Sequence, residues 1–336
     1  MNLCRVLVIA LALSGITSTA AEQVNADTDE TPESGVRSSI VEIDVSGNAI
    51  FMEKGNVDAS EKKGKKTPDP ESAEIESVVF EAPFPFSTLG VIWNSSLSPN
   101  SLTLKIEVRA SSDRKIWSDW STVKIDPHLS VEETGTYSSS LLYFGESNRY
   151  VQYRLTLSDP GTEPGAALTG LQFFFIDPGK TPVRKDLDIP SAAFSTVVRP
   201  AVVSRTGWGC PDGQNSPQWP PSYADVSHLI IHHTATTNVA NDWPAQVRSI
   251  WAYHTQHPAL LWGDIGYNYL IDPDGVIYEG RSGGDDVLGA HFSCKNTHTM
   301  GVALLGDFSS TPPTQAAISS LESLLAWKSG QDSLDP

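Results

Sequence analysis

Two different hydrophobic patterns divide most of this chain, and this division restricts its fold more than any other feature. Between positions 78 and 178, apolar residues alternate with polar ones, as at Val151, Tyr153, Leu155 and Leu157. Such alternation indicates strands with one buried face. Because the strands are short and are separated by clusters of Pro, Gly, Ser and Asn, we predict an antiparallel β-sandwich over residues 78–178.

The pattern changes beyond Ser204 to strands interleaved with helices. The run 228–233 is typical of a buried strand, and the segment that begins at Asp242 repeats its apolar residues at helical spacing. Thr314 predicts the start of a later helix, which we expect to end at Gly330. This alternation predicts a multidomain chain whose second domain is an α/β domain, with a mixed central sheet flanked by helices.

Three further segments have compositions of their own. Residues 1–21 combine a basic start, a short apolar run and small terminal residues, as a secretory signal peptide does. Residues 22–77 are polar and are expected to be mostly disordered. Within them, the alternation at 41–45 predicts either a lone hairpin strand or an extra edge of the next domain. The Pro-containing residues 179–203 have linker composition, so the α/β domain covers residues 204–336.

The signal peptide and the net charge limit the partners of the chain. No later segment is long and apolar enough to span a membrane, so we expect a secreted or periplasmic protein without a permanent membrane anchor. The formal net charge of −17 argues against nucleic acid, whose phosphates require a basic surface. Trp117 and Trp120 lie three positions apart around a turn. We expect them in the core of the sandwich, and a platform for other glycans is the alternative.

The histidines are concentrated in the α/β domain. Of eight, all except His128 lie between positions 228 and 298. His232 and His233 end a buried strand and precede a small polar run, which suits side chains that reach a cleft at the edge of a sheet. Because adjacent strand residues point to opposite faces, only one of the two can face a given metal ion. The other is expected in the core or in the wall of the groove.

Five strings of the α/β domain occur together in one known family. They are SRTGWG at 204–209, LIIHHTAT at 229–236, WGDIGYNYLIDPDGVIYEGR at 262–281, GAH at 289–291 and MGVALLGDF at 300–308. In these strings and their order, the domain resembles the peptidoglycan recognition proteins and the type-2 N-acetylmuramoyl-L-alanine amidases. The resemblance implies a zinc-dependent hydrolase of bacterial cell-wall peptidoglycan, which cleaves the amide between N-acetylmuramic acid and L-alanine. It does not cover the sandwich.

The same resemblance assigns roles to individual residues. It gives His232 the binding of zinc, and it gives Tyr267 the stabilisation of the negatively charged oxygen in the transition state. Zn²⁺ lowers the pKa of bound water to about 7, and a phenol donor aimed at the developing charge complements it. The residues placed in the peptidoglycan groove are Arg281, His291 and Asn296, and we group His233 with them. For Arg281, a surface ion pair is the alternative.

The metal ligands and the cysteines leave alternatives open. In the family, the second and third zinc ligands follow the last predicted helix, and this chain reaches Pro336 without them. The chain is therefore expected to be a fragment of a working amidase, a non-catalytic peptidoglycan-binding form, or a protein in which Cys294 and His298 join His232 at a different metal site. The third interpretation competes with a disulfide between Cys210 and Cys294, which we predict for an exported protein.

Overall fold

A computed structural model gives the structure of the chain. It describes residues 35–43, 73–95, 104–126, 135–157, 168–182, 198–258, 260 and 262–334. The predicted signal peptide lies outside the described residues, as do most of segment 22–77 and most of the linker. Within the described ranges, no helix combines the length and the apolar character needed to cross a membrane.

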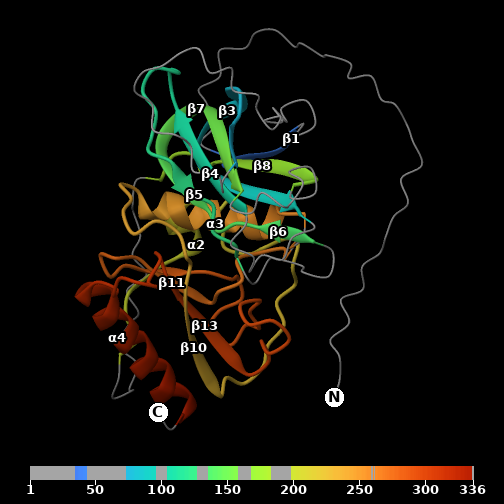
Figure 1. Cartoon of the computed structure of the whole chain (residues 1–336). Helices are drawn as coiled ribbons and strands as arrows, with labels where there is room; N and C mark the ends of the chain where they lie inside the picture. The colour runs from blue at the N-terminus through green and yellow to red at the C-terminus, as the bar shows by residue number, and fades with distance from the viewer. Residues whose placement is uncertain are drawn as a thin grey trace, which may run out of the picture. The chain divides into compact units, whose positions relative to one another are not determined.

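An antiparallel sheet of eight strands precedes the predicted α/β domain (Figure 1). Its strands are β1 (Arg37–Ile43), β2 (Ala73–Glu76), β3 (Phe80–Asn94), β4 (Leu104–Ser111), β5 (Ser121–Thr122), β6 (Thr136–Ser138), β7 (Leu142–Leu157) and β8 (Gly170–Asp177). Six strands follow the order β1-β8-β3-β7-β4-β5, while β2 pairs with β7 and β6 pairs with β3. The expected antiparallel strands are confirmed, and their hydrogen bonds join them into one sheet.

Strand β1 decides between the two alternatives predicted for residues 41–45, a lone hairpin strand and an extra edge of the next domain. Val41 pairs with Phe173 of β8, and the register continues from Arg37 to Ile43. The segment is therefore an extra edge of the antiparallel sheet and not a lone hairpin. Residues 44 and 45, the end of the predicted strand, lie outside the described residues.

Alternation along β4 separates a buried face from a partly exposed one. Ile106 and Val108 belong to the core of the antiparallel sheet. The expectation that Trp117 and Trp120 fill this core is wrong, because both are partly exposed. Their rings lie 5.0 and 4.4 Å from the guanidinium carbon of Arg109, which faces away from the core. These are cation–π contacts, in which the guanidinium of Arg109 lies over one face of each ring.

A second sheet of five strands forms the α/β domain. Its elements are β9 (Val202–Val203), α2 (Arg205–Trp208), β10 (His228–His233), α3 (Trp243–Gln256), β11 (Tyr269–Ile271), β12 (Ile277–Glu279), β13 (Thr299–Leu304) and α4 (Gln315–Asp332). The strand order is β10-β13-β11-β12-β9, and every pair is parallel except β11 with β12. The predicted mixed sheet with helices is confirmed (Figure 1).

Helix α4 covers one face of the mixed sheet. It begins where predicted, since the side chain of Thr314 accepts a hydrogen bond from the amide of Ala317. Its buried residues include Leu321 and Leu324, which pack in one cluster with the sheet. The predicted end at Gly330 is wrong, because the helix continues to Asp332. Gly330 is weakly helix-forming but has no need to terminate a helix that packing already stabilises.

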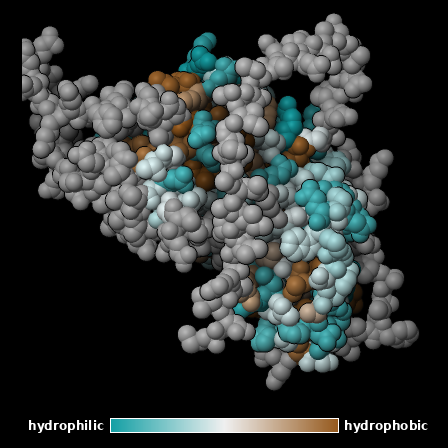
Figure 2. All heavy atoms as spheres, turned by 90° about the vertical axis from the view of Figure 1, so that its right-hand side faces the viewer, coloured by the Kyte–Doolittle hydropathy of each residue, from teal (hydrophilic) through white to brown (hydrophobic). Residues whose placement is uncertain are grey.

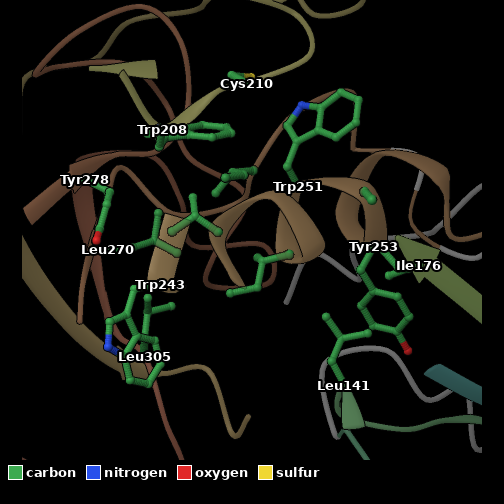
Figure 3. Packing of buried hydrophobic residues seen from close by; sticks show 14 of the residues in the cluster. Leu141, Ile176, Trp208, Cys210, Trp243, Trp251, Tyr253, Leu270, Tyr278 and Leu305 are labelled. Atoms are coloured by element: carbon green, nitrogen blue, oxygen red, sulfur yellow. The ribbon is translucent and has the colours of Figure 1, made fainter. Parts of the chain in front are cut away.

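Helix α3 packs against both sheets. Its N-cap is Asp242, as predicted, whose side chain accepts a hydrogen bond from the amide of Ala245. One hydrophobic cluster combines residues of α3 with Leu270 of the mixed sheet and Ile176 of the antiparallel sheet (Figure 3). On the antiparallel side, the hydroxyl of Tyr253 donates to the carbonyl of Ser139 at 2.7 Å. The domain boundaries near residues 178 and 204 remain a prediction.

Exposed apolar side chains are scattered over the described surface. Figure 2 shows hydrophobic residues in separate patches between hydrophilic ones on one face of the molecule. Ile231 and Tyr223 are among the large side chains exposed. Single exposed apolar residues are ordinary on a protein surface, so they indicate no docking site by themselves.

Candidate functional site

The candidate site lies on the face of the mixed sheet opposite α4. Along β13, Met300 and Val302 pack in the cluster that includes α4, whereas the intervening Gly301 and Ala303 belong to the other face. His232 pairs with Ala303 in register, so its side chain is on that same face. Because Gly301 and Ala303 are small, they leave room on this face of β13 for larger side chains from neighbouring segments.

Two imidazoles meet on this face of the mixed sheet. Nε2 of His232 lies 3.0 Å from Nδ1 of His291, and Nε2 of His291 lies 3.2 Å from the hydroxyl of Thr299. That hydroxyl is 2.8 Å from the carbonyl of Asn296, to which it donates. The hydroxyl oxygen therefore accepts from His291, which leaves Nδ1 of His291 to accept a hydrogen bond from Nε2 of His232.

Gly301 determines where His291 lies, which leads to a prediction. A Cβ atom at Gly301 would come within 2.3 to 2.6 Å of three atoms of the His291 ring. The variant Gly301→Ala is therefore expected to push the ring away from His232 and to destabilise the fold by about 1–3 kcal/mol. Chemical denaturation and the histidine ring signals in NMR spectra check both effects. Gly35→Ala, with no neighbouring atom within 4 Å, is the control; unchanged His291 signals in Gly301→Ala would contradict the account.

Tyr267 stands beside the imidazoles. Its ring centroid lies 5.5 Å from that of His232, and the residue is partly buried. Burial raises the pKa of the phenol above its ordinary value, and the carboxylate of Asp126 adds to this rise. The phenol is thus neutral at pH 7 and available as a hydrogen-bond donor. The predicted residues His232, Tyr267 and His291 are therefore brought together.

His254, on helix α3, is a neighbour of the site to which the sequence analysis assigns no role. Its ring centroid lies 5.6 Å from that of Tyr267, and its Nδ1 accepts a hydrogen bond from the amide of Gly266 at 3.1 Å. Burial, and then the charge of Arg281, lowers the pKa of His254 to about 3. Its place in the histidine cluster was the available signal, but its contact with Tyr267 depends on the tertiary fold.

The buried histidines predict that acid destabilises the chain. Burial lowers the pKa of His254 to about 3, and of His257 and His291 to about 4. An unfolded histidine has a pKa of about 6.5, so below that pH the unfolded chain binds protons that the folded chain does not. Above pH 6.5 these histidines do not reduce the free energy of unfolding. Between pH 6.5 and pH 4, each of them lowers it by up to about 1.4 kcal/mol per pH unit. Urea denaturation at pH 7 and pH 5 measures this; equal stability would contradict it.

The loop before Tyr267 is held by a buried ion pair. Nη1 of Arg205 lies 2.9 Å from Oδ1 of Asp264, and both side chains are fully buried. Asp264 also accepts hydrogen bonds from the amides of Ile265 and Ser282, at 2.8 and 2.9 Å. One carboxylate thereby joins helix α2 to the loops on both sides of strands β11 and β12.

The other predicted groove residues have structural partners. His233 accepts a hydrogen bond from the amide of Phe308 at 3.0 Å, apart from His232. Asn296 accepts from the amides of His291 and Phe292, both at 2.8 Å, and so shapes the turn that carries His291.

Arg281 is buried and not at the surface. Its guanidinium donates to the carbonyls of Ile265 and Trp262, at 3.0 and 3.3 Å, and stacks on Trp219. The alternative of a surface ion pair is therefore wrong. Burial lowers its pKa to about 10.

The predicted disulfide is not formed in this structure. Cys210 is a buried free thiol within 3.0 Å of Nη2 of Arg205, and Cys294 is an exposed free thiol. Burial raises the pKa of Cys210 to about 12. Cys210 lies in the hydrophobic cluster that includes Trp208, whereas Cys294 lies in the turn after His291.

The residues of the site do not complete a catalytic zinc centre. Zinc in such a centre takes three protein ligands and keeps one position for water. His232 and His291 offer two facing nitrogen atoms, but the described residues contain no group of three His, Cys, Asp or Glu side chains that could hold a metal ion. The alternative with Cys294 and His298 is not found either, since Nδ1 of His298 lies 2.9 Å from the carbonyl of Asp225.

Comparison with known proteins finds relatives of the α/β domain. A family model described as N-acetylmuramoyl-L-alanine amidase matches residues 222–336. Peptidoglycan recognition protein 1 of Bos taurus is 31% identical over 139 residues, which are 40% of this chain and 70% of that protein. Peptidoglycan-recognition protein SC2 of Drosophila simulans is 35% identical over 127 residues, 37% of this chain and 65% of that protein. N-acetylmuramoyl-L-alanine amidase of Homo sapiens is 33% identical over 129 residues, 38% of this chain and 22% of that protein.

Among solved structures, Drosophila peptidoglycan recognition protein (PGRP)-SA is 30% identical. The match covers 40% of this chain and 76% of that one, with a TM-score of 0.35. The chain spans 65% of the Drosophila simulans relative and 59% of peptidoglycan-recognition protein 2 of Holotrichia diomphalia.

The mixed sheet and its helices form an α/β domain, most of which the amidase family model matches. The chain belongs to the family of peptidoglycan recognition proteins and N-acetylmuramoyl-L-alanine amidases. The resemblance found in the sequence is thereby confirmed. The named relatives include both amidases and recognition proteins.

Proposed function

We propose that this chain binds bacterial peptidoglycan, with the bond between muramic acid and L-alanine held beside His232, Tyr267 and His291. The observation that carries the proposal is the meeting of two imidazoles and a neutral phenol above the small residues of β13. An amide group offers a carbonyl acceptor and an N–H donor, and this site offers donors and acceptors for both. The family, which includes proteins named for peptidoglycan recognition, supports this choice of ligand.

A pull-down with purified sacculi tests the proposal. The wild-type chain is expected to sediment with the sacculi, and His232→Ala is expected to lose most of this binding. His228→Ala is the matched control, because His228 begins the same strand but is exposed and bonded to Ser227. Equal sedimentation of both variants would place binding elsewhere, and no sedimentation of the wild type would end the proposal.

The second candidate function is N-acetylmuramoyl-L-alanine amidase activity. The match of the amidase family model to residues 222–336 favours it, because that range contains His232, Tyr267 and His291. In this reaction Tyr267 would donate its proton in a hydrogen bond to the carbonyl oxygen as negative charge develops there. Release of stem peptides from sacculi, with and without added zinc, measures this activity. No release under either condition would reject it and leave binding as the function.

Export fits this ligand. We infer that the chain acts outside the cytoplasm, as a secreted or periplasmic protein, because peptidoglycan lies there. Immunodetection in culture medium and cell fractions tests this. A chain that stays with the cytoplasmic fraction would overturn it.

A further inference from the structure

Asn268, the residue after Tyr267, is buried, with 3% of its surface exposed. Its amide donates to the carbonyl of Gly301 at 2.9 Å, and its carbonyl accepts from the amide of Gly280 at 2.9 Å. Gly301 belongs to β13, and Gly280 directly follows β12. These bonds therefore fix the main chain beside Tyr267 to both neighbours of β11.

The side chain of Asn268 forms two further buried hydrogen bonds. Its Oδ1 accepts from the amide of Gly301 at 2.8 Å, and its Nδ2 donates to the carbonyl of Val287 at 2.8 Å. An amide N–H only donates and a carbonyl only accepts, so these partners determine which end of the carboxamide is the oxygen. Val287 lies in the connection between β12 and His291, residues 280–290. The side chain thus joins this connection to β13.

The carboxamide lies beside the ring of His291. A Cβ atom at Gly289 would be 2.6 Å from Cδ2 of that ring and 3.2 Å from Oδ1 of Asn268. Gly301 makes room for the same ring, and its amide is the group bonded to Oδ1. Asn268 is therefore next to both of the glycines against which His291 packs, while its main chain continues that of Tyr267.

The connection also has an attachment that does not involve Asn268. The amide of Leu288 donates to the carbonyl of Ser222 at 2.7 Å. Because this main-chain bond lies next to Val287, the connection stays attached when Asn268 is replaced. Such a replacement is expected to remove only the bond that holds Val287 to the residue beside Tyr267, so the connection can shift relative to the phenol.

We propose that Asn268 is a positioning residue of the site, whose carboxamide sets how far the imidazole of His291 lies from the phenol of Tyr267. It can do so because it accepts from Gly301 and donates to Val287 at once, which an apolar side chain or an ionised carboxylate cannot do. Its effect on the ligand rests on the proposed function, since an amide group bound by both rings requires them at a fixed separation.

The positioning role is tested first without ligand, in a chain with isotope-labelled histidine and tyrosine. Asn268→Leu keeps a similar size but removes both side-chain hydrogen bonds, so the NMR signals of the His291 and Tyr267 rings are expected to move. Asn148→Leu is the matched control, because Asn148 is also buried and its Nδ2 donates to two carbonyls, but within the antiparallel sheet. Ring signals that stay in place in Asn268→Leu, or that move equally in Asn148→Leu, would overturn the inference.

The consequence for the ligand is tested with a soluble muramyl tripeptide. Asn268→Leu is expected to raise the dissociation constant by about fivefold or more, and Asn148→Leu to leave it unchanged. If Asn268→Leu does not fold, both measurements are made on Asn268→Ser, whose shorter side chain cannot span the two partners. Unchanged affinity in the folded variant would overturn the role in binding. If the wild type binds no muramyl tripeptide, the proposed function fails, while the ring signals still decide whether Asn268 positions them.

Discussion

Asp264→Ala is expected to destabilise the chain by about 3–5 kcal/mol, the largest loss of stability among the changes considered. The substitution leaves the guanidinium of Arg205 without its carboxylate in a place that solvent does not reach, since both side chains are fully buried. It also removes the acceptor for the amides of Ile265 and Ser282. The free energy of unfolding, from urea denaturation, gives the loss directly.

An exposed ion pair provides the comparison for this result. Nη2 of Arg37 lies 2.5 Å from Oδ2 of Asp177, but the Arg37 side chain is 56% exposed. Arg37→Ala is therefore expected to change stability by no more than about 1 kcal/mol. A loss in Asp264→Ala as small as that in Arg37→Ala would show that the buried pair does not hold the loop before Tyr267.

Tyr267→Phe is expected to slow the release of stem peptides from sacculi by about 100- to 1,000-fold, if the chain is an amidase. The substitution removes only the hydroxyl hydrogen bond to the carbonyl oxygen, which matters most when negative charge develops there. Binding to sacculi should change far less, because phenylalanine keeps the ring contact with His232.

The control for this prediction is Tyr223→Phe. Tyr223 is 61% exposed and belongs to a loop that bridges to Val287, so its hydroxyl should not affect release. Release by Tyr267→Phe at the wild-type rate would remove the phenol from the mechanism.

Much of the fold could be predicted because its signals are local. Period-2 alternation predicts the strands around Val151, and the side chain of Asp242 marks the start of α3 in both sequence and structure. The opposite directions of His232 and His233 follow from strand geometry alone. They have separate partners in the structure, His291 and the amide of Phe308.

The remaining features depend on residues far apart in the chain. The large apolar rings of Trp117 and Trp120 are typical of core residues, but the guanidinium of Arg109 on β4 lies over both rings. Nothing near Arg205 or Asp264 in sequence shows that these charges will pair with each other in the interior.

NMR spectra of the chain with labelled histidine and tyrosine, recorded as muramyl tripeptide is added, test the central claim most directly. The account predicts saturable shifts in the signals of His232, His291 and Tyr267, with His228 and Tyr150 unaffected. Tyr150 stacks on Arg114 at the antiparallel sheet and reports any binding there. Saturable shifts at Tyr150 with none at His232 and Tyr267, or no shifts at any concentration, would contradict it.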